Sequence, residues 1–146
     1  MVIQIDIDGT INQAPAIFSA MTKALGGNGH RILVVSARVE DSESREFTTK
    51  QLREWRIDYE ELILTPPFRQ LIPSWFPPNL PLEQRAIFFK VMTARERRVD
   101  VAFEDDGLVI DLFRAYLPEM QVFQVLDHHV YRLKSDAAMA RPDEKS

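Results

Sequence analysis

The sequence predicts an α/β protein with three layers, in which a Rossmann-like open parallel sheet lies between helices. Five short apolar segments predict the strands: residues 2–7, 31–36, 62–64, 100–103 and 121–125. They lack regular polar alternation, which is typical of strands covered on both faces. Segments with apolar residues at helical spacing lie between them, and this alternation indicates βαβ units and a parallel sheet.

Four stripes of mainly apolar residues predict the helices that connect the strands. Gly26 and Gly27 close the first stripe and indicate the end of its helix. The crossovers should be right-handed, as almost all connections between parallel strands are. The stripes consist of Ile17, Met21, Ala24 and Leu25; of Thr48, Leu52 and Trp55; of Ile87, Phe88, Val91 and Met92; and of Val109, Leu112, Phe113 and Tyr116.

The composition predicts a single globular domain. The chain has 146 residues, of which 45% are hydrophobic and 27% are charged, and we expect the domain to span residues 1–134, followed by a polar tail at 135–146. The net charge of −4 does not support a general binder of nucleic acids or anionic membranes. The sequence contains no cysteine, which excludes a disulfide, a thiol nucleophile and a cysteine zinc site.

No apolar run approaches the roughly 20 residues that a membrane-spanning helix needs. We therefore expect a soluble, cytoplasmic protein, whose oligomeric state the sequence leaves open. The segment 65–81 interrupts the alternation of strands and helices, and it holds most of the nine prolines. Because proline lacks a backbone donor, we expect this segment to leave the sheet. It is either a long surface connection or a lid beside the functional site.

Acidic and phosphate-binding residue types gather where the predicted strands end. Asp6 and Asp8 end the first strand, Ser36 ends the second, and the acidic residues 104–106 follow the fourth. Lys90 opens the helix that precedes the fourth strand. Ligands of open parallel sheets bind beyond the carboxyl ends of the strands. We therefore expect these side chains to form one site.

The first acidic pair indicates a bound cation. On an extended chain Asp6 and Asp8 point to the same side, about 6.6 Å apart, and their like charges oppose each other unless a cation bridges them or one is protonated. Mg²⁺ fits a site built from carboxylates without histidine or cysteine. Gly9 allows a sharp turn and a close approach of the backbone to a ligand. The alternative is a simple turn after the strand, with both carboxylates solvated.

The order of these residues resembles the haloacid dehalogenase superfamily. The likeness runs from residue 2 to about 126, and it comprises Asp-Ile-Asp-Gly-Thr at residues 6–10, then Ser36, Lys90 and the acidic run 104–106. The first motif is quite specific, whereas the serine and the lysine gain weight by order and spacing. We expect the strand order 5-4-1-2-3. The chain is too short for the large cap domains of many members, so no large cap is expected.

The resemblance implies a covalent phosphatase mechanism. Asp6 would be the nucleophile that carries a transient aspartyl phosphate, and Asp8 would be the general acid and later the base. Mg²⁺ would be held by Asp6, by the backbone carbonyl of Asp8 and by Asp105. Dehalogenases of the superfamily have no acid at the position of Asp8, so its presence favours phosphoryl transfer.

The resemblance also implies that Ser36 and Lys90 hold the phosphoryl oxygens, and we expect Thr10 to contribute to phosphate binding. The alternative is that Lys90 lies on a helix surface and that Arg85 or Arg95 binds phosphate. The acidic run reads Glu104-Asp105-Asp106, whereas the family commonly has Gly-Asp or Asp-Asp, so the sequence leaves the metal ligand open by one residue. With Asp105 as the ligand, Glu104 or Asp106 would act from the second layer around the metal.

Arg38 is a further candidate ligand for substrate phosphate, and the alternative is an ion pair with Glu40 or Asp41. The stretch 36–64 loosely resembles polynucleotide 3′-phosphatase domains, in which an arginine also follows the hydroxyl residue of the second strand. The sequence thus predicts an Mg²⁺-dependent phosphomonoester hydrolase, with a nucleotide or polynucleotide end as one candidate substrate. A binding or regulatory module that keeps the fold without turnover remains the alternative.

Overall fold

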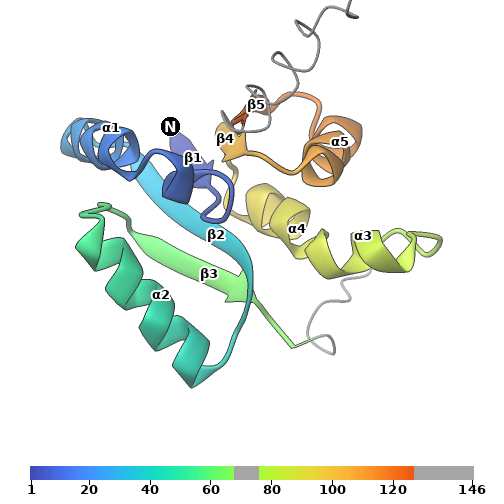
Figure 1. The fold of residues 1–146 in the computed structure, drawn as a ribbon. Helices are drawn as coiled ribbons and strands as arrows, with labels where there is room; N and C mark the ends of the chain where they lie inside the picture. Colours follow the sequence, from blue (N-terminus) through green and yellow to red (C-terminus); the bar gives the residue numbers. More distant parts are fainter. Residues whose placement is uncertain (68–75, 127–146) are drawn as a thin grey trace, which may run out of the picture.

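A computed structural model of the chain describes residues 1–67 and 76–126, in which five parallel strands form one sheet (Figure 1). The order β3-β2-β1-β4-β5 is the predicted order seen from the other edge. The strands are β1 (Val2–Ile5), β2 (Arg31–Val39), β3 (Glu61–Thr65), β4 (Val101–Glu104) and β5 (Gln121–Gln124). Residues 68–75 and 127–146 lie outside the described part. They include the expected tail and the centre of the proline-rich segment.

Helices cover both faces of the sheet, which gives the three layers that the sequence predicts. One layer contains α1 (Pro15–Gly27) and α2 (Ser42–Glu54), and the other contains α4 (Phe89–Glu96) and α5 (Gly107–Tyr116). A short helix α3 (Leu82–Ile87) precedes α4, and a 3-10 turn η1 (Ile11–Gln13) precedes α1. No cap domain occurs within the described residues.

Two hydrophobic cores lie on opposite faces of the sheet, and the central strands contribute side chains to both. On β2, Leu33 and Val35 pack toward α4 and α5, while Ile32 and Val34 pack toward α1 and α2. All four side chains are buried. Because the strand is covered on both faces, it needs no polar alternation, as the sequence predicts.

The apolar stripe of α1 differs from the predicted one. Ile17 is 67% exposed, whereas the neighbouring Phe18 is buried and meets the edge of the Phe103 ring at a centroid distance of 6.0 Å. The sheet side of the helix therefore begins one residue later than predicted. The predicted helix end at Gly26 and Gly27 is also displaced. Helix α1 continues through Gly27, and the glycine with a left-handed backbone, φ of 80°, is Gly29.

Two predicted boundaries are wrong, and both affect the site. The first strand ends at Ile5 rather than at residue 7, because the chain turns over residues 7–10. The second strand continues to Val39 rather than to residue 36, with a register shift between Val35 and Val39. In addition, a turn at Phe88 divides the third predicted helix into α3 and α4.

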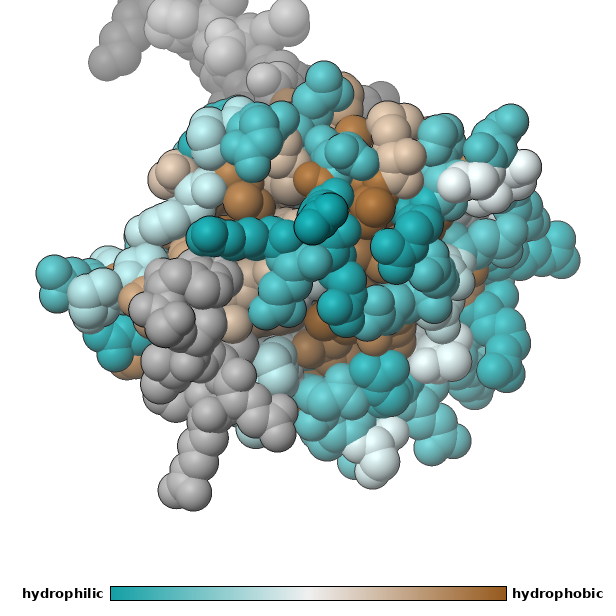
Figure 2. Space-filling model, turned by 180° about the vertical axis from the view of Figure 1, so that it is seen from behind, coloured by the Kyte–Doolittle hydropathy of each residue, from teal (hydrophilic) through white to brown (hydrophobic). Residues whose placement is uncertain are grey.

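The face opposite to the view of Figure 1 is mainly hydrophilic. In its coloured part, hydrophobic side chains show in small areas between polar ones (Figure 2). Single exposed apolar residues of this kind are common on soluble domains. Within the described ranges 1–67 and 76–126, no helix has the length and apolar composition that crossing a bilayer requires.

Candidate active site

The site begins where β1 ends. Ile5 pairs with Phe103 in the parallel register, and the amide of Asp6 still donates to the Phe103 carbonyl at 3.1 Å. Asp6 immediately follows Ile5 in the chain, and Glu104 immediately follows Phe103. Asp6 and Glu104 are therefore neighbours at the carboxyl edge of the sheet. Beyond this point the chain turns back, and the amide of Thr10 donates to the Ile7 carbonyl at 3.2 Å.

Three carboxylates converge at this edge. Asp6, Glu104 and Asp105 each offer one oxygen, and these oxygens lie within 4.8 Å of one another. Asp6 and Glu104 are buried, and Asp105 is half-buried. A cluster of carboxylate oxygens suits a hard divalent cation. The cluster is thus a candidate metal site formed by the ends of β1 and β4.

Lys90 forms the cationic part of the same cluster. It lies in the first turn of α4 and is 3% exposed. Its Nζ donates to Asp6 Oδ1 and to Glu104 Oε2, both at 2.8 Å. Of the two alternatives, Arg85 donates instead to the Leu80 carbonyl at 2.7 Å, and Arg95 lies in the last turn of α4, at the opposite end of that helix from Lys90. The buried ammonium therefore offsets the repulsion between the two buried carboxylates.

Burial shifts the ionisation of this group of residues. It raises the pKa of Asp6 from 3.8 to about 6, since the stabilising charge of Lys90 does not fully compensate the loss of solvent. The pKa of Glu104 rises from 4.5 to about 7 for the same reason. Burial alone would lower the pKa of Lys90, but the charges of Asp6 and Glu104 raise it overall. Lys90 is therefore an ammonium at neutral pH.

These shifts predict the pH dependence of stability in the metal-free protein. An acid whose pKa is raised by folding binds more protons when folded than when unfolded, between its two pKa values. For Asp6 and Glu104 this window runs from about pH 4 to pH 7. Stability should therefore fall as the pH rises through this window. In chelator, we expect ionisation of the cluster to lower the free energy of unfolding by roughly 2 kcal/mol or more as the pH rises from about 4 to about 8.

Urea unfolding of the parent and of Glu104→Gln at a series of pH values measures this contribution. The amide does not titrate, so the fall in stability with rising pH should be smaller in the variant. Identical pH profiles for the two proteins would contradict the assigned pKa shift of Glu104.

Gly9 permits the close approach between the first turn and Asp105. Its φ is 84°, in the left-handed region, and a Cβ at this position would collide with the Asp105 carboxylate. The next residue, Thr10, is buried, and its Oγ1 donates to Asp105 Oδ1 at 3.4 Å. The glycine therefore lets Asp105 come close to the turn that follows Asp6. Thr10, a predicted phosphate ligand, lies beside the carboxylate cluster.

Gly9→Ala should therefore weaken binding of a divalent cation, whereas Gly29→Ala should not. Gly29 has a similar φ of 80°, but a Cβ there would meet no described heavy atom within 4 Å. Both variants should lose about 1–2 kcal/mol of stability from the left-handed backbone. The rise in Tm caused by added Mg²⁺ should shrink markedly only in Gly9→Ala. Equal Mg²⁺ responses in both variants would show that Asp105 is not needed for the metal.

Asp8 lies on the solvent side of the site. Because β1 ends at Ile5, Asp6 and Asp8 do not project from one extended strand as predicted, and the Asp8 side chain is 57% exposed. Arg38 holds it with two hydrogen bonds, from Nε to Oδ2 at 2.9 Å and from Nη2 to Oδ1 at 2.8 Å. Asp8 therefore faces Arg38, while Asp6 faces Lys90.

The predicted alternative partners of Arg38 are engaged elsewhere. Glu40 forms a two-bond ion pair with Arg45, and Asp41 accepts from the amide of Ser44 as the N-cap of α2. The alternative pairing of Arg38 with Glu40 or Asp41 therefore does not occur, and Arg38 pairs with Asp8. The residue that forms the pair comes from the first acidic motif, 30 residues away.

Ser36 and the acidic run occupy distinct positions. Ser36 is buried inside β2 rather than at its end, and its Oγ accepts from the amide of Arg38 at 3.3 Å. Asp106 accepts from the amide of Leu108 and caps α5, so its side chain acts in the helix. The sequence left open whether Glu104 or Asp106 contributes to the metal site. Glu104 is a central member of the buried cluster.

Glu104 could have been recognised from the strand register. It immediately follows Phe103, which pairs with the residue before Asp6. Its Oε1 accepts from the amides of Asp105 and Asp106, both at 3.2 Å, while Oε2 accepts from Lys90. Both carboxylate oxygens therefore have partners, which fix the loop that carries Asp105.

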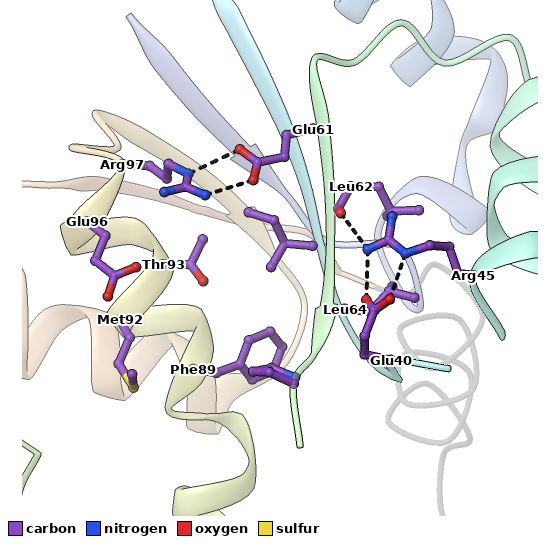
Figure 3. A pocket seen from close by; sticks show the side chains of 12 residues that line it. Glu40, Arg45, Glu61, Leu62, Leu64, Phe89, Met92, Thr93, Glu96 and Arg97 are labelled. Carbon is purple, nitrogen blue, oxygen red and sulfur yellow. Dashed lines mark hydrogen bonds and ion pairs between the residues drawn. The ribbon is translucent and has the colours of Figure 1, made fainter. Parts of the chain in front are cut away.

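A cavity of about 320 Å³ lies apart from this cluster, along the edge strand β3 (Figure 3). Figure 3 shows Arg97 directed toward Glu61 and Arg45 directed toward Glu40. Arg45 also donates to the Leu62 carbonyl at 3.1 Å. The carboxylates of Glu61 and Glu40 are therefore engaged in ion pairs. The Arg45 contact occupies a carbonyl on the edge strand.

No protein-family model and no curated protein matches this chain. Two solved structures share its fold, "Structure of Pnkp1/Rnl/Hen1 complex" and "Structure of the Pnkp1/Rnl/Hen1 RNA repair complex", both with a TM-score of 0.59. Their matched chains are 21% and 19% identical to this one. The likeness covers 85% of this chain but 44% and 42% of those chains, so this chain spans less than half of their length. At these identities the likeness shows the fold.

Proposed function

We propose that the protein is a divalent-metal-dependent phosphatase of the haloacid dehalogenase type, and that it hydrolyses a phosphomonoester at the end of a nucleic acid. The observation that carries this proposal is the buried group around Asp6, in which Glu104, Asp105 and Lys90 meet the end of β1. A carboxylate beside an ammonium and a candidate cation site is suited to attack on a negatively charged phosphate.

Asp6 is the proposed nucleophile. Lys90 fixes one of its oxygens and lowers the repulsion that an approaching phosphate would meet. The Asp6 carboxylate forms a bond to phosphorus as the bond to the leaving oxygen breaks. Water then attacks phosphorus, the acyl phosphate bond breaks, and Asp6 is restored. Ser36 and Thr10 are the proposed ligands of the transferring phosphoryl oxygens, together with Lys90.

The carboxylate cluster fits Mg²⁺ by its chemistry and by its spacing of 4.8 Å or less. We assign the metal to Asp6, Asp105 and the backbone carbonyl of Asp8. Glu104 holds Lys90 and the loop amides, so both its oxygens are occupied by the protein. When bound, Mg²⁺ would neutralise charge that develops on the phosphoryl group.

Asp8 is the proposed acid and base. It gives a proton to the leaving oxygen and later takes one from the attacking water. In the structure its carboxylate is paired with Arg38. In the proposed cycle Arg38 exchanges Asp8 for an oxygen of the substrate phosphate, which frees Asp8 to carry a proton.

The substrate proposal rests on two likenesses. The stretch 36–64 resembles polynucleotide 3′-phosphatase domains, and the chains of an RNA repair complex share the fold. The arginine that supports the sequence likeness is Arg38, which contacts Asp8. We therefore propose a phosphate at a polynucleotide end as the substrate.

A comparison of phosphomonoesters tests this function. Phosphate release should be measured from a 3′-phosphorylated oligonucleotide, its 5′-phosphorylated counterpart and glycerol phosphate, each with Mg²⁺ and with chelator. We expect hydrolysis that requires the metal and is fastest for an oligonucleotide. Equal rates in chelator would remove the metal from the mechanism. Binding without hydrolysis of any substrate would favour the non-catalytic module.

A further inference from the structure

An exposed aromatic ring lies beside Arg38, the residue that holds Asp8. Phe47 belongs to α2, whose Thr48 and Leu52 are buried, but its own side chain is 60% exposed. Leaving a phenyl ring in water forgoes the stabilisation of burial. A scattered apolar residue needs no special explanation, so the significance of Phe47 depends on its neighbours.

Arg38 connects Phe47 to the proposed acid. The centre of its guanidinium lies 5.8 Å from the centroid of the Phe47 ring. The same guanidinium donates to both oxygens of Asp8, to Thr48 Oγ1 at 3.1 Å and to Gln51 Oε1 at 2.8 Å. These acceptors fix its position. The Phe47 ring and the proposed acid Asp8 therefore lie beside the same guanidinium.

We propose that Phe47, supported by Arg38, stacks against the base of the nucleotide that carries the scissile phosphate. This inference rests on the proposed function, because Asp8 must face the leaving nucleoside. With the leaving sugar oxygen at Asp8, the proposal places the attached base on the Arg38 side of the site, where Phe47 lies. An exposed aromatic ring beside an arginine is a suitable stacking surface for any base, because every base has a π-face.

The charge of the protein supports recognition of the terminal nucleotide alone. A groove that follows many phosphates needs a basic field, whereas this chain has a net charge of −4. On α2, Glu43 and Glu46 precede Phe47 and Lys50 follows it, so the charges around the ring are mixed rather than basic. We therefore infer a site for one nucleotide, which accepts different bases and gains little from a longer strand.

A substrate that lacks the terminal base provides the test. We would compare a 3′-phosphorylated trinucleotide with the same molecule whose 3′-terminal residue is abasic, using the parent protein, Phe47→Ala and Phe47→Trp. Phe47→Ala should lower kcat/KM for the complete substrate by roughly 5- to 100-fold, as expected for loss of one base stack. It should change the rate for the abasic substrate by less than about twofold, and Phe47→Trp should retain the preference for a base.

Phe123→Ala is the matched control. Phe123 is also an exposed phenylalanine, but it lies on β5 and stacks on Phe103 at a centroid distance of 5.3 Å. Its replacement should leave the preference for the complete substrate unchanged. Equal losses on both substrates in Phe47→Ala, or no loss on either, would overturn stacking while leaving the phosphatase intact. Failure of the parent protein to hydrolyse any phosphomonoester would overturn both proposals.

Discussion

Replacing Asp6 with asparagine should reduce phosphate release by about 10⁴-fold or more, the scale seen when a covalent nucleophile is removed. The amide keeps nearly the same volume but lacks the negative charge that attacks phosphorus. Lys90 keeps its ion pair with Glu104 in this variant, so the buried ammonium still has a partner. We therefore expect a folded, inactive protein.

Asp111→Asn is the matched control for this substitution. Asp111 is exposed on α5, and the same change of carboxylate to amide there should leave turnover within about twofold of the parent. Turnover by Asp6→Asn at an appreciable fraction of the parent rate would mean that water attacks the substrate directly. In that case Asp6 would serve the metal rather than form a bond to phosphorus.

Lys90→Met should cause the largest loss of stability, about 3–5 kcal/mol, because it removes one partner of a buried ion network. The substitution leaves the carboxylates of Asp6 and Glu104 facing each other without the ammonium at 2.8 Å from each. Their charges can then be relieved mainly by protonation. Activity should also be lost, since the proposed phosphate ligand and the contact that orients Asp6 are both absent.

Arg97→Met provides the comparison for a surface ion pair. Arg97 pairs with Glu61 at the same distance of 2.8 Å, but both side chains are more than a third exposed. Its loss should cost less than about 1 kcal/mol. Urea unfolding at pH 7 in chelator measures both variants. Similar losses for Lys90→Met and Arg97→Met would show that the buried cluster does not depend on its ammonium.

The layers could be predicted because they depend on patterns local to each segment, whereas the strand order was expected from the order of the motifs and their resemblance to a known superfamily. Strands buried on both faces, such as β2, have continuous apolar sequences, and connecting helices have apolar residues at helical spacing. The end of β1 was harder to predict. Ile7 is buried and looks like a strand residue, but it already belongs to the turn that brings Asp8 toward Arg38.

The contacts of the site depend on tertiary structure that no local pattern contains. Lys90 and Asp6 are 84 residues apart, and their meeting requires the crossover of α4 above β1. Glu104 differs from Asp105 in function because strand geometry turns its side chain toward Lys90. The motif 6–10 thus indicated a carboxylate site from sequence, while the register of β1 and β4 determined which neighbouring acids join it.

The most direct test of the covalent mechanism is a single-turnover reaction of the Asp8→Asn protein with an aryl phosphate labelled at phosphorus. An aryl oxide leaves with little help from an acid, but hydrolysis of the aspartyl phosphate still needs a base. We predict that labelled protein accumulates, that the label lies on Asp6, and that hydroxylamine releases it. Release of labelled phosphate at the parent rate without labelled protein, or a label on another residue, would contradict the mechanism.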